Sequence, residues 1–74
     1  MFEKLAEIIV EYVDIDKESI KPETRFMEDM GFTSFDFMSM MGQIEDTFDV
    51  EVDPQEASKI VTMQDAVDYL SGLQ

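Results

Sequence analysis

The chain has 74 residues, and its 18 Asp and Glu residues against five Lys and Arg residues give a formal net charge of −13. Nucleic acids and anionic membranes require positive charge on a protein, so this balance argues against both and favours basic protein partners. Because the chain contains neither Cys nor His, disulfides, thiolate metal sites, Ser–His–Asp triads and Cys–His pairs are excluded.

The apolar spacing of residues 2–13 predicts a first helix. Apolar residues recur there every three or four positions, which places them on one face of a helix, while Glu residues line the opposite face. The residues expected to face the core are Phe2, Leu5, Ile8, Ile9 and Tyr12 or Val13.

Residues 14–24 are polar, and we expect them to form a long loop. Pro22 supports this interpretation, because its ring disfavours a helical conformation at the residue before it. The expected anchors of the loop to the core are Ile15 and Ile20, with Phe26 and Met30 at its far end.

Residues 28–48 are the stretch around which the rest of the chain is organised. Gly31 interrupts the backbone pattern, Thr33 and Ser34 supply two adjacent hydroxyls, and apolar residues then recur with a helical period. We therefore expect a second helix over residues 34–48. Its predicted inner face is formed by Phe37, Met40, Met41, Ile44 and Phe48.

Thr33 and Asp36 have the spacing of a capping box at the start of this helix. If Thr33 is the cap, Ser34 is the first helical residue and its hydroxyl has no capping role. A phosphate attached there would lie among free backbone N–H groups, which favour negative charge. Most hydroxyl residues at such positions are caps only, so the stretch by itself leaves both interpretations open.

The end of the chain carries two further helix starts. Pro54 suits the first position of a short helix capped by Asp53 and ending near residue 59 or 60. Thr62 is then expected to cap a last helix, which Gly72 ends. The residues of that helix expected to point inward are Met63, Ala66, Val67 and Leu70.

These elements predict an all-α fold, a small four-helix bundle of three main helices and one short helix with a long first loop. We expect a single domain over residues 1–74, with little room for a substrate cleft. The chain has enough carboxylates for a hydrolase that uses two of them, but we expect it to have no enzymatic activity. Without disulfides, a signal peptide or a transmembrane segment, the chain fits a cytoplasmic location.

Calcium binding is a natural hypothesis for so acidic a chain. Asp14, Asp16 and Glu18 have the alternate spacing of an EF-hand loop, but Ser19 and Arg25 replace the Gly and the bidentate Glu that the loop requires. A second acidic run, over residues 49–60, also lacks the required Gly and Glu at the same two positions of the loop. We therefore predict no metal site.

Phe35, Met38 and Gly42 lie on a different side of the second helix from its predicted inner face. If they are exposed, they form a mixed apolar and acidic patch with Glu45 and Asp46, which suits contacts with several partners in turn. The alternative is that the long loop covers them.

The region around Ser34 resembles the attachment motif of the acyl carrier proteins, which reads roughly Gly-x-Asp-Ser-Leu-Asp. In this chain the motif stands as Gly31, Phe32, Thr33, Ser34, Phe35 and Asp36. The resemblance continues through residues 26–31, residues 44–48 and the tail over residues 56–70. It therefore covers nearly the whole chain.

The resemblance implies a carrier rather than a catalyst. Ser34 would bear a covalent 4′-phosphopantetheine arm, added from coenzyme A by a phosphopantetheinyl transferase. The arm would hold growing acyl chains as thioesters for fatty acid biosynthesis, and the bundle would shelter them. A monomer is implied, whose partners are acyl-transferring and chain-elongating enzymes with basic docking patches. The positions implied to face them are Phe35, Asp36, Met38, Glu45 and Asp46.

Three departures from the family pattern keep other interpretations open. Thr33 stands where fatty-acid carriers usually have Asp, Ser39 where Glu is common, and Phe37 is bulkier than usual. A carrier of a specialised polyketide, nonribosomal peptide or lipid pathway is one alternative. The other is an acidic helical interaction module without a prosthetic group, in which Ser34 only begins a helix.

Overall fold

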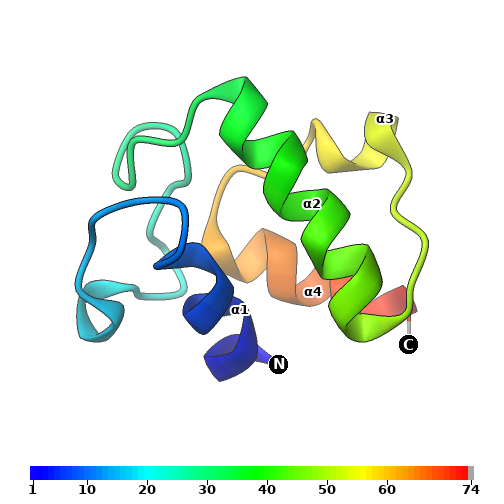
Figure 1. The fold of residues 1–74 in the computed structure, drawn as a ribbon, viewed down its shortest axis with the longest axis horizontal. Coiled ribbons are helices and arrows are strands. Elements are labelled where there is room, and N and C mark those ends of the chain that lie inside the picture. Colours follow the sequence, from blue (N-terminus) through cyan, green and yellow to red (C-terminus); the bar gives the residue numbers. More distant parts are fainter. Residues whose placement is uncertain (74) are drawn as a thin grey trace.

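Four helices make up the regular structure of the computed structural model, which describes residues 1–73. In Figure 1 the long loop occupies one side of the molecule, α3 the other, and α2 spans the view between them. The predicted all-α fold is confirmed, and none of the helices in residues 1–73 has the length and apolar character needed to cross a membrane. The elements are α1 (Phe2–Ile9), a 3-10 turn η1 (Lys17–Ser19), α2 (Ser34–Phe48), α3 (Pro54–Ala57) and α4 (Met63–Leu73).

The core is one cluster of apolar side chains from all four helices and the long loop. Within residues 1–73 no polar or charged side chain is buried, so the core contains no charge that needs a partner. Phe2, Tyr12, Val13, Phe48 and Val67 lie at its edge and are partly buried. The largest fully buried side chains are those of Leu5, Ile9, Phe26, Met40, Met41, Ile44, Met63 and Leu70.

Phe26 anchors the long loop to α2. Its ring is 1% exposed and packs edge-on against Phe32, with ring centroids 5.6 Å apart, and against Phe37, at 5.3 Å. Edge-to-face contacts at these distances add to the stabilisation that burial of the rings already gives. The other predicted anchors also pack against the core, with Ile20 and Met30 buried and Ile15 partly buried.

The loop is also joined to the start of α4 by antiparallel backbone hydrogen bonds, which we call the loop–α4 clasp. The N–H of Phe26 donates to the carbonyl of Val61 at 2.9 Å, and the N–H of Met63 donates to the carbonyl of Thr24 at 2.9 Å. This pairing has no counterpart in the sequence prediction, which treats the loop as irregular.

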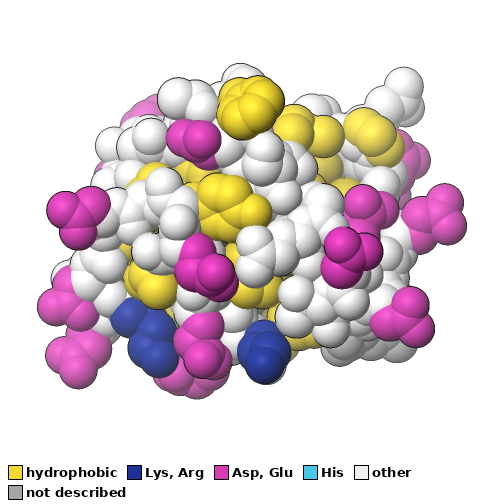
Figure 2. All heavy atoms as spheres, in the orientation of Figure 1, with side chains coloured by type: hydrophobic (Ala, Val, Ile, Leu, Met, Phe, Trp, Pro, Cys, Tyr) yellow, Lys and Arg dark blue, Asp and Glu magenta, His cyan; other side chains and the backbone are white. Residues whose placement is uncertain are grey.

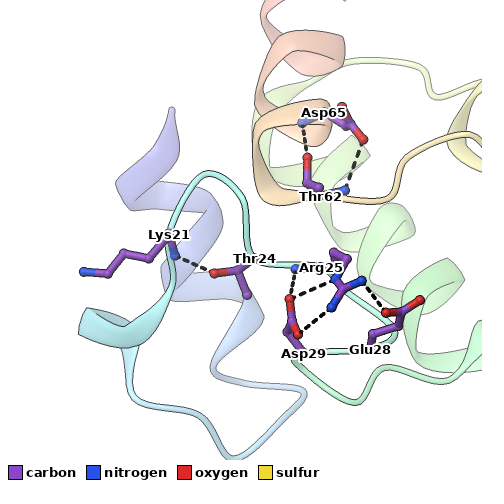
Figure 3. A network of polar contacts seen from close by, with 7 residues as sticks. All are labelled: Lys21, Thr24, Arg25, Glu28, Asp29, Thr62 and Asp65. Carbon is purple, nitrogen blue, oxygen red and sulfur yellow. Dashed lines mark hydrogen bonds and ion pairs between the residues drawn. The ribbon is translucent and has the colours of Figure 1, made fainter.

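Arg25 stabilises the loop side of the clasp, as Figure 3 shows. The carboxylate of Asp29 accepts hydrogen bonds from the Arg25 backbone N–H at 2.8 Å and from its Nε at 3.2 Å, and Glu28 forms an ion pair with the same guanidinium. The hydrogen bonds from Arg25 hold the pKa of Asp29 below its ordinary value. All three side chains are exposed, so we expect the ion pairs themselves to contribute little.

Thr62 and Asp65 form a reciprocal cap on the α4 side of the clasp. Oγ1 of Thr62 accepts the N–H of Asp65 at 3.2 Å, while the Asp65 carboxylate accepts the N–H groups of Thr62 and Val61, both at 3.1 Å. These backbone donors lower the pKa of Asp65. The predicted capping role of Thr62 is therefore confirmed.

The starts of α2 and α3 also follow the prediction. Oγ1 of Thr33 accepts the N–H of Asp36 at 3.1 Å, and Oδ1 of Asp53 accepts the N–H of Gln55 at 2.9 Å. The backbone of Asp53 is further held by Tyr69, whose hydroxyl accepts its N–H at 3.0 Å. Each cap satisfies a backbone donor that the first helical turn leaves unpaired.

The first helix is shorter than predicted, because α1 ends at Ile9 rather than at residue 13. After Ile9 the backbone forms a tighter turn, in which the N–H of Tyr12 donates to the carbonyl of Ile9, three residues back, at 2.9 Å. This tighter turn is typical of helix ends. It brings the Tyr12 hydroxyl to Gln43 on α2, where it donates to Oε1 at 2.7 Å.

Two other helix ends also differ from the prediction. α3 ends at Ala57 rather than near residue 59 or 60, because the N–H of Ile60 bonds three residues back, to the Ala57 carbonyl, at 3.1 Å. Gly72 does not end α4, which continues to Leu73. A glycine marks a helix end only where the backbone turns left-handed, and Gly72 keeps a helical backbone.

We expect Thr33→Ala to lower the free energy of unfolding by about 1 kcal/mol, since the N–H of Asp36 loses its acceptor. For a domain of this size that corresponds to roughly 4–8 °C in melting temperature. Thr33→Ser should restore most of the loss, and Thr47→Ala, an exposed change within α2, should cause none. Equal losses in the Thr33→Ala and Thr47→Ala variants would contradict a capping role.

Asp65→Asn should lower the melting temperature at pH 7, by an amount equivalent to about 0.5–1 kcal/mol. Because the folded state holds the pKa of Asp65 below its unfolded value, the carboxylate stabilises the protein above about pH 4, and this contribution is lost as the pH falls further. The deficit should therefore shrink in thermal melts between pH 7 and pH 3. Glu51→Gln changes the net charge equally, and a similar deficit in that variant would point to charge alone.

Candidate functional site

Ser34 occupies the first position of α2 and is exposed. Gly31 turns the chain just before it, with a φ of 80° that residues other than Gly rarely adopt. Thr33 has an extended backbone and supplies the capping hydroxyl, so the Ser34 hydroxyl has no such role. Within residues 1–73 it makes no hydrogen bond, which leaves it accessible at the helix N-terminus.

An apolar groove of about 260 Å³ opens beside Ser34, between α2 and α3. We call it the Ser34 groove. Its walls come from three separate segments, and Ser34 and Ser58 supply its only hydroxyls. Its apolar lining consists of Met27 from the loop, Phe37 and Met38 from α2, and Ala57 and Ile60 from α3 and the turn that follows.

Two of the predicted partner-facing residues are prominent at this end of α2. Phe35 is 80% exposed and Met38 is 47% exposed, so the long loop does not cover them. Met27, at the groove mouth, is also 47% exposed. Figure 2 shows hydrophobic side chains gathered over the start of α2 and toward α3, while the dark-blue Lys and Arg side chains lie at the opposite edge of this face.

The three predicted carboxylates are not equivalent. Asp36 is half-buried in the first turn of α2, and Asp46 is exposed near its end. Glu45 is partly buried, and its Oε2 accepts the N–H of Val52 at 2.9 Å. Glu45 therefore holds the connection between α2 and α3. The structure groups Asp36 with Ser34. Glu45 and Asp46 lie about three helical turns from Ser34, roughly 17 Å along the axis.

Several groove residues were missed by the sequence prediction. Met27, Ala57 and Ile60 were not expected near Ser34, although Met27 follows a predicted anchor and Ala57 lies in the predicted short helix. Their position depends on how the loop and α3 pack against α2, which the local pattern does not specify. A second hollow, of about 280 Å³, lies on another side of α3 and is mostly lined by charged residues, namely Glu56, Lys59, Ile60, Asp65, Asp68 and Tyr69.

The surroundings of Ser34 fit a phosphate-linked prosthetic group with an apolar cargo. The exposed hydroxyl lies at the N-terminus of a 15-residue helix, where free N–H groups favour a phosphate. The adjoining groove is apolar. Across residues 1–73, no three acidic side chains converge in a way that could hold a metal ion.

Comparisons with known proteins agree with this geometry. The family model described as "Phosphopantetheine attachment site" matches residues 3–70. An acyl carrier protein from Enterococcus faecalis is similar in structure, with a TM-score of 0.86 and 29% identity over 99% of this chain and 92% of that one. A proposed acyl carrier protein from Mycobacterium tuberculosis gives a TM-score of 0.87 at 22% identity, over 97% of each chain, which shows the shared fold alone.

The family match covers far more than half of the chain, and the structural match to the Enterococcus faecalis protein extends over almost all of it. The resemblance noted in the sequence is thereby confirmed. The chain belongs to the acyl carrier protein family and is a carrier domain for the 4′-phosphopantetheine prosthetic group.

Proposed function

We propose that the chain carries acyl groups as thioesters on a 4′-phosphopantetheine arm attached to Ser34. The observation that supports this assignment most directly is that Thr33 caps α2, while the exposed hydroxyl of Ser34 remains free. The N–H groups of the first turn of α2 would stabilise the negative phosphate. When bound, the arm supplies the thiol that a chain without cysteine lacks.

The protein itself would shield and present the cargo rather than transform it. The Ser34 groove offers apolar side chains beside the attachment point, which favours an acyl chain over a polar aminoacyl group. We therefore propose a non-catalytic, monomeric and cytoplasmic carrier for fatty acid biosynthesis. A specialised polyketide, peptide or lipid pathway is the alternative, and Thr33 and Phe37, which depart from the usual pattern, favour it.

Ser34→Ala should abolish attachment of the arm and leave the helical content nearly unchanged. The test is mass spectrometry after incubation with coenzyme A and a broad-specificity phosphopantetheinyl transferase. Ser58→Ala is the matched control, because Ser58 is the other exposed hydroxyl of the groove and should leave the mass gain intact. A mass gain on Ser34→Ala would disprove the site. No gain on the wild type with any transferase would favour an interaction module without a prosthetic group.

We propose that α2 is also the docking surface for the transferase and the acyl-processing enzymes, through Phe35, Asp36, Met38, Glu45 and Asp46. Residues 27–57 contain no Lys or Arg, so the surface around Ser34 favours basic partners. Phe35 and Met38 supply exposed apolar contact area. Glu45 would act partly through its bond to Val52, so Asp46 gives the cleaner test of charge.

Asp46→Lys should slow association with a basic transferase by about 2- to 5-fold at low ionic strength, equivalent to roughly 0.4–1 kcal/mol of Coulomb energy, and should flatten the salt dependence. Stopped-flow association rates at several salt concentrations measure this. Glu7→Lys on α1 changes the net charge equally. If that variant slows association as much, overall charge rather than a docking surface on α2 is responsible.

A further inference from the structure

We infer that Gly42, the exposed glycine in the middle of α2, is the contact point for a basic side chain of the phosphopantetheinyl transferase. The aliphatic part of that Arg or Lys side chain would lie across Gly42 beside Met38, and its cationic end would reach Asp46. This assignment rests on the proposed function, because it assumes that the transferase docks on α2 to modify Ser34.

Gly42 has no role that the fold itself requires. Its backbone is helical, and among residues 1–73 Gly31 is the only glycine with a positive φ. A Cβ atom added at Gly42 would meet nothing within 4 Å, so no close packing excludes a side chain there. Glycine inside a helix is less favourable than alanine, because it loses more backbone freedom on folding. α2 therefore carries a residue that costs stability and that no contact within residues 1–73 explains.

Gly42 interrupts the side-chain cover of α2 in the middle of the proposed docking surface. Phe35 and Met38 precede it by seven and four positions, and Asp46 follows it by four, so these residues lie on one side of the helix. Phe35 is 80% exposed and Met38 47% exposed, and Gly42 and Asp46 are exposed as well. We call the uncovered backbone between Met38 and Asp46 the Gly42 gap.

The two neighbours of the Gly42 gap determine which side chain fits it. A side chain that crosses the gap has the apolar Met38 one helical turn to one side and the carboxylate of Asp46 one turn to the other. Arg and Lys combine an apolar stem with a charged end, so they match both. The guanidinium of Arg can also form two hydrogen bonds with one carboxylate. Within residues 1–73 no ion pair involves Asp46, which leaves its charge available to a partner.

The transferase is the partner that we assign to the Gly42 gap. It has to reach Ser34, and Gly42 lies eight residues further along the helix, roughly 12 Å away. A standard protein interface covers about 800 Å² on each partner and so extends roughly 25 Å across. An enzyme that docks along α2 with Ser34 in its active site therefore covers Gly42 too. Residues 27–57 contain no Lys or Arg, so this surface attracts a basic enzyme.

A second copy of this chain is a poorer match for the same surface. Each copy has a net charge of −13 and only five basic residues. Two of these, Lys17 and Arg25, already pair with carboxylates of their own chain. Self-association through the Gly42 gap would therefore have to overcome general repulsion with few cations to offset it.

The test compares side chains of increasing size at position 42. Gly42→Ala should raise the melting temperature by about 3–8 °C, because it favours the helix and meets no neighbour. With a transferase that modifies the wild type, kcat/KM for attachment of the arm should fall by about 2-fold in Gly42→Ala and by roughly 5- to 100-fold in Gly42→Leu, which fills the gap. Mass spectrometry measures the rates. Both losses should appear in KM with kcat unchanged, because Gly42 is remote from Ser34.

Thr47→Leu and Gly72→Ala are the matched controls. Thr47 is exposed and lies about 140° around the helix axis from Gly42, so a leucine there adds the same bulk outside the docking surface and should leave kcat/KM unchanged. Gly72 is a helical glycine that also has open space at its Cβ position, and Gly72→Ala should lower neither the melting temperature nor kcat/KM. Because the Gly42 variants should be more stable than the wild type, unfolding cannot explain their slower attachment.

A double-mutant cycle tests the contact with Asp46. Asp46→Asn should lower kcat/KM by about 2- to 3-fold in the wild type. It should cause little further loss in Gly42→Leu, because both changes remove the same contact. If the two losses multiply instead, Asp46 acts independently of the Gly42 gap, and the assigned contact is wrong.

Other results would also overturn the inference. These are no loss with Gly42→Leu, an equal loss with Gly42→Ala, and an equal loss with Thr47→Leu, and each would leave attachment to Ser34 in place. A wild-type dimer that Gly42→Leu abolishes, as measured by analytical ultracentrifugation, would assign the surface to a second copy instead. If no transferase modifies the wild type, the proposed function and this inference both fail, and that result appears before any variant is compared.

Discussion

The edge-on packing of Phe26 between Phe32 and Phe37 is the contact on which the rest of the structure depends. It fixes the far end of a long polar loop to α2, and the Phe26 N–H bonds the same residue to the segment before α4. The turn at Gly31 and the exposed Ser34 follow directly from this anchor. An attachment site on a flexible loop would face partner enzymes in many orientations, whereas the proposed site at Ser34 begins a helix that is packed on a core.

In residues 1–73 the charged side chains all lie outside the buried core. Every carboxylate lies at the surface or its edge, and the core is wholly apolar. The acidic surface disfavours the compact state through self-repulsion, so stability must come from apolar burial, caps and backbone pairing. The acidity is therefore a cost to the fold, and under the proposed function its benefit would be recognition by basic partners.

The sequence predicts those features that depend on neighbouring residues. Thr33, Asp53 and Thr62 mark three helix starts because a cap and its backbone donor lie within three positions of each other. The periodicity of α2 likewise identifies the buried Phe37. It places Phe35 on another side of the helix but does not decide between exposure and cover by the long loop.

The features that the sequence could not predict depend on contacts between distant segments. The loop–α4 clasp joins residues nearly 40 positions apart through backbone groups, which carry no side-chain signal. The Ser34 groove exists only once the loop, α2 and α3 meet. Glu45 looked like a surface carboxylate because its acceptor role requires the return of the chain at Val52.

The two helices that border the Ser34 groove differ greatly in length, 15 residues in α2 and four in α3. A helix of four residues has almost no stability of its own, so α3 keeps its shape through the cap at Asp53, the Tyr69 hydroxyl and the burial of Ala57. The α3 wall of the groove therefore depends on contacts with other segments, whereas α2 is long enough to keep its own hydrogen-bond ladder, so we expect the loss of those contacts to disturb α3 before α2.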